Sequence, residues 1–537
     1  MANTLKFGNG NWATKDGSTL AYNDESGFNP LPFDFTRASS ATVVNKNGLI
    51  EEVASGIPRI DFLGNTKGAL LLEPSRTNLI AQSEAFGSSY WLKSGASIQG
   101  DPSTAGVEKV VNGNFANGLN NWTVNGGSYA TIVSGALNSN NTDAGNWFAE
   151  NVSQDISFVN GKMYKVTFKA KNISGNLNLR LTQGANVIFN GDITSSFVDY
   201  EVFYTANADN SSVRIFCNDN VGQFQIDNVS VKEVQGFASP SADSPLGAFK
   251  LVEDTSNGGH NIQRVENVSN ATIYTSSVFV KYGGREWIRL TDAQSSNRIH
   301  FNTLTGAFGA ITGTVIDYNS IALSNGWYKL SITTTSVATA YALRVSLAEA
   351  DNDVSYTGDG TSGVYIYGAQ LEAGSYSTSL INTSGSAVTR EADVCNNGAN
   401  SEVINSTEGV FYVQMAKSDV TAPEGGIRLS LDASNYIALN FATNNRLNLF
   451  VNVGGSNQVY MDNSTYNLSE YHKIAVKYKL NNYAVYVDGT QIHTDTSATV
   501  PTGLNKMNYI GFQGNTKDIK LYTTALTDAE LIALTTI

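Results

Sequence analysis

The sequence is poor in charged residues, in cysteine and in long apolar runs. Charged side chains make up 15% of its 537 residues, against roughly 25% in an ordinary globular protein. The two cysteines, Cys217 and Cys395, are too few to build a disulfide framework or a metal cluster. No stretch approaches the ~20 apolar residues that a membrane-spanning helix needs. We therefore expect no membrane insertion.

The charges that are present are mostly negative. The net charge is −13 at pH 7, and no run of Lys or Arg reverses it locally. A phosphate backbone attracts basic surfaces and repels acidic ones, so we expect no nucleic-acid partner. The first residues, Met1-Ala-Asn-Thr-Leu-Lys-Phe-Gly8, contain no apolar signal core. We expect synthesis in a reducing cytoplasm and release by lysis.

Glycine and aromatic residues take the place of the missing charge. The chain has 49 Gly, 25 Tyr and 24 Phe, a composition that suits β-strands joined by tight turns. Runs with a period near two, such as Tyr274-Thr-Ser-Ser-Val-Phe-Val-Lys281, are typical of antiparallel sandwiches. A chain of this length needs several cores. We predict an all-β fold of several β-sandwiches or jelly rolls.

Two segments look like the start of a sandwich and two look like the end of one. The starts begin at Ser83 and Val111, and the ends begin at Gln225 and Val364. Their order along the chain is start, start, end, end, which predicts that one sandwich is inserted in another. The predicted domains are an irregular N-terminal region (1–79), an outer sandwich (80–106 and 237–392), an inserted sandwich (107–236), a linker (393–400) and a jelly roll (401–537).

No catalytic constellation stands out. A glycosidase needs two carboxylates about 5–10 Å apart, but no acidic pair lies in a recognisable catalytic context. The four histidines, His260, His300, His472 and His493, share no metal-like spacing, and no serine lies in a nucleophile-elbow sequence. We predict a protein without enzymatic activity and without a cofactor.

Sugar binding is the chemistry that the residues favour. Pyranose rings stack on Trp or Tyr, whereas Asn, Asp and Arg side chains bind their hydroxyls. In the inserted sandwich Trp147 is the candidate, with core or interface packing as the alternative, and Trp122 is expected to pack inside. In the jelly roll, Tyr460, Tyr466 and Tyr486 could line a glycan groove or contact other copies in a trimer.

Several runs resemble bacteriophage virion proteins. Phe35-Thr-Arg-Ala-Ser-Ser-Ala-Thr42, Leu71-Leu-Glu-Pro-Ser-Arg-Thr-Asn-Leu79, Tyr356-Thr-Gly-Asp-Gly-Thr-Ser-Gly-Val-Tyr-Ile-Tyr-Gly-Ala-Gln-Leu-Glu372 and Gly385-Ser-Ala-Val-Thr-Arg-Glu-Ala-Asp-Val394 look like segments of phage fibre and tail proteins. The opening Leu5-Lys-Phe-Gly-Asn-Gly-Asn-Trp-Ala-Thr14 resembles fibre-like proteins of Bacteroidetes phages, including the crAss-like group. This resemblance implies a head or tail fibre, usually a homotrimer, attached to other virion proteins through its N-terminal region. The implied location is the virion, after synthesis in the host bacterial cytoplasm.

Two further resemblances concern the sandwiches. Val111-Asn-Gly-Asn-Phe115 with Ile226-Asp-Asn-Val-Ser-Val231 is similar to carbohydrate-binding modules of the galactose-binding-like class. The region from Val485-Tyr-Val-Asp-Gly489 to Leu531 looks like a concanavalin A-like, or laminin G-like, jelly roll. The module resemblance implies a structural calcium, with Asn114 and Asp227 at the matching positions. Such modules often have an acidic residue where this chain has Asn114.

These observations together lead to one hypothesis. The chain is a non-enzymatic phage fibre of the head or tail, whose N-terminal region attaches to the virion while the sandwiches project outward. Several weak sites would bind host-surface or environmental glycans, because copies that act together gain avidity without new contacts. The alternatives are a purely structural virion appendage, a polysaccharide depolymerase and a secreted bacterial adhesin.

Overall fold

The computed structural model describes residues 33–537 apart from 65, 102–104, 127–129, 142–150, 161, 176–177, 207–208, 210, 219–221, 235 and 245–246. Before residue 33 it describes the backbone of five short strands: β1 (Asn3–Leu5), β2 (Ala13–Lys15), β3 (Ser18–Leu20), β4 (Asn23–Asp24) and β5 (Gly27–Phe28). The described chain is built almost wholly of antiparallel sheets, so the predicted all-β fold is confirmed. None of the helical segments in this part of the chain has the length and apolarity to cross a membrane.

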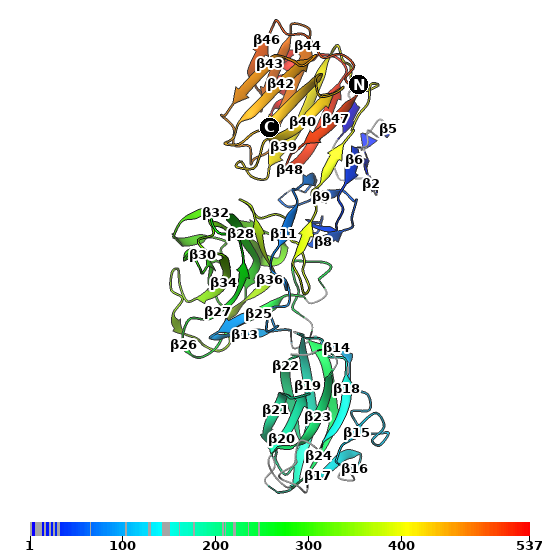
Figure 1. Cartoon of the computed structure of the whole chain (residues 1–537), viewed down its shortest axis with the longest axis vertical. Helices are drawn as coiled ribbons and strands as arrows, with labels where there is room; N and C mark the ends of the chain where they lie inside the picture. Colours follow the sequence, from blue (N-terminus) through cyan, green and yellow to red (C-terminus); the bar gives the residue numbers. More distant parts are fainter. Residues whose placement is uncertain are drawn as a thin grey trace.

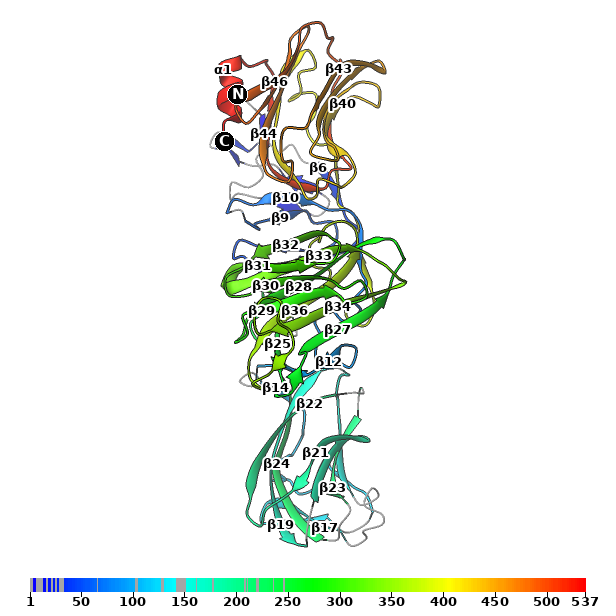
Figure 2. The same cartoon turned by 90° about the vertical axis from the view of Figure 1, so that its left-hand side faces the viewer.

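Three β-sandwiches lie in a row along the long axis of the molecule (Figures 1 and 2). The C-terminal sandwich occupies one end, and a sandwich made of residues 105–234 occupies the other. A third sandwich, the middle sandwich, lies between them. Each of the three has its own cluster of buried apolar side chains, as expected for a chain too long for a single core.

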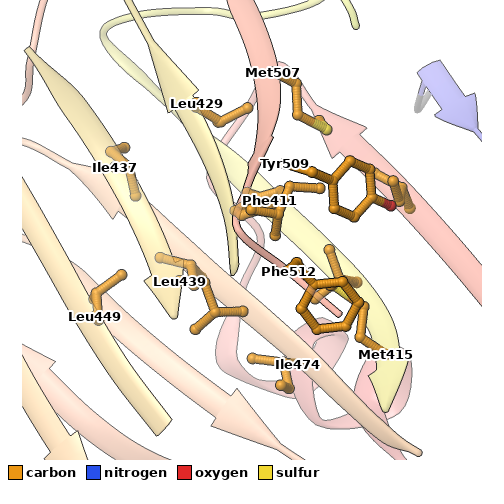
Figure 3. Close-up of a cluster of buried hydrophobic side chains, with 14 of the residues drawn as sticks. Phe411, Met415, Leu429, Ile437, Leu439, Leu449, Ile474, Met507, Tyr509 and Phe512 are labelled. Carbon is orange, nitrogen blue, oxygen red and sulfur yellow. The ribbon is translucent and has the colours of Figure 1, made fainter. Parts of the chain in front are cut away.

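The C-terminal sandwich packs an eight-stranded sheet against a five-stranded one. The sheet orders are β46-β45-β44-β39-β48-β10-β9, with β1 also on β48, and β43-β42-β41-β40-β47. Inward-facing side chains such as Phe411, Leu439 and Ile474 fill the space between the sheets (Figure 3). The strands are β39 (Glu408–Lys417), β40 (Gly425–Ser430), β41 (Tyr436–Phe441), β42 (Leu447–Val453), β43 (Ser456–Asn463), β44 (His472–Lys479), β45 (Tyr483–Val487), β46 (Thr490–Asp495), β47 (Lys506–Ile510) and β48 (Gly514–Tyr522).

A short helix, α1 (Asp528–Thr535), covers the outer face of the eight-stranded sheet. Thr527 is its N-cap, and its side chain accepts a hydrogen bond from the backbone N–H of Glu530. The Glu530 side chain accepts one in return from the backbone of Thr527, so the predicted capping box is confirmed. Leu531 is fully buried beneath the helix.

The middle sandwich is built from two separate stretches of chain. β12 (Leu92–Ser94) and β13 (Ala96–Gln99) precede residue 105, whereas the other strands follow residue 248. The sheet orders are β12-β27-β34-β29-β30-β31 and β13-β25-β36-β28-β33-β32. The later strands are β25 (Phe249–Glu253), β27 (Asn261–Asn267), β28 (Ile273–Tyr282), β29 (Trp287–Asp292), β30 (Asn297–Asn302), β31 (Phe308–Thr312), β32 (Val315–Ala322), β33 (Trp327–Thr335), β34 (Ala340–Ala348) and β36 (Gly363–Ala373), with the 3-10 turn η1 (Ser324–Gly326) and the small pair β26 (Asn257–Gly258) and β35 (Tyr356–Thr357).

Residues 105–234 form a sandwich that both begins and ends beside the middle sandwich. Its sheet orders are β16-β17-β24-β19-β22, with β14 on β24, and β15-β18-β23-β20-β21. Trp122 is buried in its core, as expected. The strands are β14 (Ala105–Glu108), β15 (Thr123–Val124), β16 (Ala130–Val133), β17 (Ala136–Asn141), β18 (Val152–Ile156), β19 (Met163–Ser174), β20 (Asn178–Gln183), β21 (Asn186–Asp192), β22 (Val198–Thr205), β23 (Ser211–Asn218) and β24 (Gly222–Val234).

The predicted N-terminal region, 1–79, pairs with strands from other parts of the chain. β9 (Arg59–Asp61) and β10 (Ala69–Leu72) extend the eight-stranded sheet of the C-terminal sandwich by pairing β10 with β48. The segment also contains a hairpin, β7 (Ala41–Val44) with β8 (Ile50–Val53), and β11 (Arg76–Asn78) pairs with β37 (Val388–Arg390). The inserted sandwich, rather than the C-terminal one, therefore lies farthest from the N-terminal strands (Figure 1).

The predicted linker 393–400 is also part of the fold. β38 (Val394–Asn396) pairs with β6 (Phe33–Thr36) in a four-stranded sheet. Cys395 is 1% exposed and packs with Phe33 and Phe35 in the core of the C-terminal sandwich. The small, polar composition of this segment had suggested a loop, but long-range strand pairing determines its conformation. Both cysteines are buried.

A buried arginine–carboxylate network joins these N-terminal strands to the segment that follows the middle sandwich. Arg59 Nη1 donates to Glu73 Oε2 at 2.7 Å, and its Nη2 pairs with Asp393. Arg390 pairs with Glu73 at 2.8 Å and Arg37 with Asp393 at 3.1 Å. All five side chains are at most 5% exposed. Because isolated buried charges are very costly, each depends on its partners.

Hydrogen bonds complete the network around its carboxylates. Glu73 accepts bonds from the backbone N–H and hydroxyl of Ser379, at 2.8 and 2.6 Å. Burial alone would raise the pKa of Glu73, but the charges of Arg390 and Arg59 hold that pKa well below its ordinary value. Asp393 also accepts from the backbone N–H of Glu73 at 2.8 Å. Ion pairs and backbone hydrogen bonds thus hold the two carboxylates in the same positions.

We predict that Glu73→Gln destabilises the molecule by about 3–5 kcal/mol, because it leaves two buried guanidinium groups without their shared carboxylate. Chemical denaturation should show this loss for the middle and C-terminal sandwiches and not for the inserted one. The stabilisation by Glu73 is present above the ordinary carboxyl pKa of 4.5 and is lost as the pH falls through the lower folded value.

The matched control is Glu201→Gln, which breaks the more exposed pair of Glu201 with Lys165 in the inserted sandwich. Pairs of that kind contribute about 0–1 kcal/mol. Equal losses in the two variants would contradict the role given to the network.

Candidate functional site

The outer face of the five-stranded sheet in the C-terminal sandwich presents aromatic and amide side chains. Alternation along the strands sends Ile437 and Leu439 of β41 into the core and leaves Tyr436 and Asn440 outside. On β42 the residues that face out are Asn448, Phe450 and Asn452. We call this surface, together with Arg428, Tyr460 and Asp462, the platform.

Its centre is a pair of aromatic rings beside a small residue. In the register of the sheet, Ala438, Phe450 and Tyr460 lie opposite one another on three adjacent strands. The rings of Phe450 and Tyr460 are 5.2 Å apart and tilted by 44°. Tyr460 is 49% exposed. Ala438 leaves room beside the two rings, so a flat apolar ligand face can lie against them.

Polar side chains contact the two tyrosines of the platform, Tyr436 and Tyr460. Asn452 donates to the Tyr436 hydroxyl at 2.9 Å, and the Arg428 guanidinium lies 5.0 Å from the Tyr436 ring centroid. Arg446 forms a two-contact pair with Asp462, and its hydrogen bonds lower the pKa of that carboxyl. The platform therefore combines aromatic rings with amide, guanidinium and carboxylate groups, the set that binds sugar hydroxyls.

A hollow of about 320 Å³ lies at one edge of the platform, beside β40 and β47. Asn508 is anchored there, since its side-chain oxygen accepts from the Asn397 N–H at 2.9 Å and its amide donates to Ser430 Oγ at 3.2 Å. The hollow is lined by Asn396, Asn397, Arg428, Ser430, Asp432, Ala433, Lys506, Asn508 and Ile510. It offers further polar groups to a ligand that extends beyond the rings.

The other two predicted tyrosines of this sandwich do not lie on the platform. Tyr466 is half-buried, packs against the core and meets His472 edge-on at 5.2 Å. Tyr486 is 1% exposed and packs against the residues beneath α1. Burial raises the pKa of Tyr486 to about 12. Its ring has no face open to a sugar.

The predicted residues of the inserted sandwich are placed only in part. Trp147 lies outside the described residues. Asn114 is exposed and accepts a bond from the Ala116 N–H, while Asp227 accepts one from the Asn228 N–H at 2.7 Å. The described part of the chain contains no group of three His, Cys, Asp or Glu side chains that could hold a metal ion. The calcium site stays a prediction.

Arg428, Tyr436 and Phe450 are among the platform residues that were not predicted from the sequence. The alternation of buried and outward-facing residues along a strand could have identified them. Each of the three is the immediate neighbour of a buried aliphatic residue in its strand. The sequence does not show that these three residues share a face with Tyr460, because that depends on the order β43-β42-β41-β40 in the sheet.

A second concave region lies where the N-terminal segment meets the middle and C-terminal sandwiches. It is a cavity of about 450 Å³ whose lining includes Asp61, Asp317, Lys329, Tyr376 and Tyr471. Lys329 donates to the Thr378 carbonyl, and burial lowers its pKa. Burial also raises the pKa of Asp61 to about 6, although the N–H groups of Leu63 and Val44 donate to it.

We predict that Asp61 makes stability fall as the pH rises. The folded state holds its proton more tightly than the unfolded chain, whose pKa is 3.8, so stability is lost between pH about 4 and about 6. A rise of the pKa from 3.8 to about 6 corresponds to about 3 kcal/mol. Asp61→Asn should therefore raise the melting temperature at pH 7.5 more than at pH 4. An equal change at both pH values would contradict this assignment.

One family model matches the chain. Residues 411–532, which form most of the C-terminal sandwich and carry the platform, match the concanavalin A-like lectin/glucanases superfamily. The predicted concanavalin A-like jelly roll is thereby confirmed for this region. Among curated protein sequences, none matches this chain.

Solved structures share local likeness with the chain. The CBM40 of the Ruminococcus gnavus IT-sialidase, bound to α2,6-sialyllactose, is 15% identical at a TM-score of 0.22, over 26% of this chain and 93% of that one. The CBM22-1–CBM22-2 tandem of Paenibacillus barcinonensis Xyn10C is 14% identical at a TM-score of 0.24, and the match covers 51% of this chain and 98% of that one. The LG1–3 region of the laminin α2 chain is 10% identical at a TM-score of 0.21, and the match covers 71% of this chain and 96% of that one. TM-scores this low carry no argument about function.

Proposed function

We propose that this protein is a non-enzymatic adhesive component of a bacteriophage virion, a head or tail fibre that holds glycans on the faces of its β-sandwiches. The observation that carries the glycan part is the platform. It lies on a sandwich of the concanavalin A-like lectin/glucanases superfamily and exposes Tyr460 and Phe450 among amide groups. An exposed aromatic ring edged by hydrogen-bonding groups suits a pyranose ring.

The virion part rests on the resemblance of four sequence runs to phage fibre proteins. Three of these runs supply charged members of the arginine–carboxylate network: Arg37, Glu73, and Arg390 with Asp393. The resemblance therefore concerns residues that organise the whole molecule rather than a single loop. The partners that this proposal includes are further copies of the chain in a homotrimer and a virion protein that binds the N-terminal strands.

The order of the modules refines the proposal. β9 and β10 are part of the C-terminal sandwich, so an attachment through the N-terminal region holds that sandwich near the particle. The inserted sandwich then projects farthest from the particle (Figure 2).

We predict that Tyr460→Ala weakens glycan binding about tenfold, which corresponds to about 1.4 kcal/mol, because it removes the exposed half of the ring pair. The measurement is glycan-array screening of the whole protein, followed by titration of the best glycan. The control is Tyr282→Ala, which removes a 39% exposed tyrosine from the middle sandwich. The proposal is wrong for the platform if no glycan is retained, or if both variants bind alike. Release of new reducing ends would favour a depolymerase.

Immunogold electron microscopy of intact phage tests the virion part. One antibody recognises residues 401–537, and a second recognises a tag inserted in the turn between β16 and β17 at Ser134, which is exposed. We expect gold on the particle with both, and the tag farther from its surface. Particles without gold would rule out the virion role, and a tag nearer the surface would overturn the module order.

A further inference from the structure

A cluster of three arginines lies on one face of the middle sandwich, and one of them, Arg344, donates to the side-chain oxygen of Gln263 at 2.7 Å. Arg289 of β29, Arg298 of β30 and Arg344 of β34 occupy outward positions, since their strand neighbours Leu290, Ile299 and Val345 are buried in the core. Among the described residues none of the three forms an ion pair, whereas Arg264 and Arg285 of the same sandwich do. We call this surface the arginine face.

Sheet register brings the three guanidinium groups together. Thr291 lies directly opposite Arg298 on one side and Arg344 on the other. Arg289, two residues before Thr291, is diagonal to both, at a typical Cβ separation of about 7–8 Å. The three charges repel one another, and burial together with this repulsion lowers the pKa of Arg289. A protein with a net charge of −13 thus concentrates positive charge at one spot.

Buried polar atoms on the same face lack protein partners. They are Arg289 Nε, Thr291 Oγ1, Arg298 Nε, His300 Nε2 and Ser346 Oγ. The three residues Thr291, His300 and Ser346 are 4%, 0% and 2% exposed. Buried polar groups are normally hydrogen-bonded to protein or to ordered water, so these atoms give the face hydrogen-bonding capacity that no protein group uses.

The kinds of atoms indicate the kind of ligand. His300 Nδ1 lies 3.0 Å from the Ala310 carbonyl, which can only accept, so Nδ1 carries the proton in this contact. Burial lowers the pKa of His300, which leaves Nε2 as a neutral acceptor for a hydroxyl. Guanidinium groups suit a carboxylate, which they bind with two parallel hydrogen bonds.

Trp287 completes the surface with a ring. It is half-buried on β29, two residues before Arg289 and therefore on the same face, opposite Ala348 and Asn302. An indole ring on the face that carries the three arginines offers stacking to one pyranose ring of a chain whose acid groups reach the guanidinium groups. A nucleic acid would need a longer basic track along its phosphates.

We propose that the arginine face binds an acidic polysaccharide, with Arg289, Arg298 and Arg344 on a sugar carboxylate and Trp287 on a pyranose ring. This site lies in a different sandwich from the platform, so it goes beyond the proposed function. If Tyr460→Ala does not weaken glycan binding, the proposal for the arginine face still stands. If the arginine face binds no acidic polysaccharide, the proposal for the platform still stands.

Isothermal titration of the whole protein with an oligogalacturonate and with a maltooligosaccharide of equal length tests the proposal. We expect binding of the acidic chain alone, weakened at least tenfold by Arg289→Gln or Arg298→Gln and by a rise in salt. The control is Arg264→Gln, which removes the same charge from an arginine already paired with Glu266 at 2.7 Å on β27. It should bind within twofold of the native protein.

Melting temperature separates binding from structure. The Gln variants should melt at or above the native temperature, because they relieve repulsion between like charges. Trp287→Ala changes no charge and should still weaken binding. The proposal is overturned if the protein has no affinity for the oligogalacturonate, or if Arg264→Gln weakens binding as much as the other Gln variants do. It is also overturned if Trp287→Ala leaves binding unchanged, or if a single-stranded DNA dodecamer binds equally tightly.

Discussion

The pairing of three buried arginines with two carboxylates is the interaction on which the arrangement of this molecule depends. Glu73 comes from the N-terminal segment and Asp393 from the segment after the middle sandwich, and Arg59 contacts both. A buried charge without a partner is strongly destabilising, so both carboxylates depend on their guanidinium partners. The two chain segments are therefore held at one place, and the C-terminal sandwich is fixed relative to the middle one.

Local sequence patterns were enough to predict the kind of structure but not its connections. Alternation in Tyr436-Ile-Ala-Leu-Asn-Phe441 and the Thr527–Glu530 capping box depend only on near neighbours, and both are present as expected. The pairing of Leu71 with Asn515, or of Phe35 with Cys395, joins residues hundreds of positions apart. Nothing in the short polar segment around Cys395 distinguishes a linker from a strand until its partner is known.

The same distinction applies to the binding surfaces. Tyr460 could be identified from sequence because it is an aromatic residue in a strand-like run, and it is exposed in the structure. Tyr486 has the same local appearance, yet α1 covers it. Arg289, Arg298 and Arg344 are ordinary single arginines in the sequence. Only the strand order β34-β29-β30 makes them neighbours, so their shared role depends on topology.

The way in which residues 105–234 join the rest of the chain has a consequence for the evolution of such proteins. The first and last strands of this sandwich are paired, with Ala105 opposite Val234, so the chain enters and leaves at one place. In the described part of the chain, no strand of the middle or C-terminal sandwich pairs with a residue of 105–234. Recombination could therefore exchange this module for another whose ends lie equally close, and a lineage could acquire a new outermost surface while it keeps the same base.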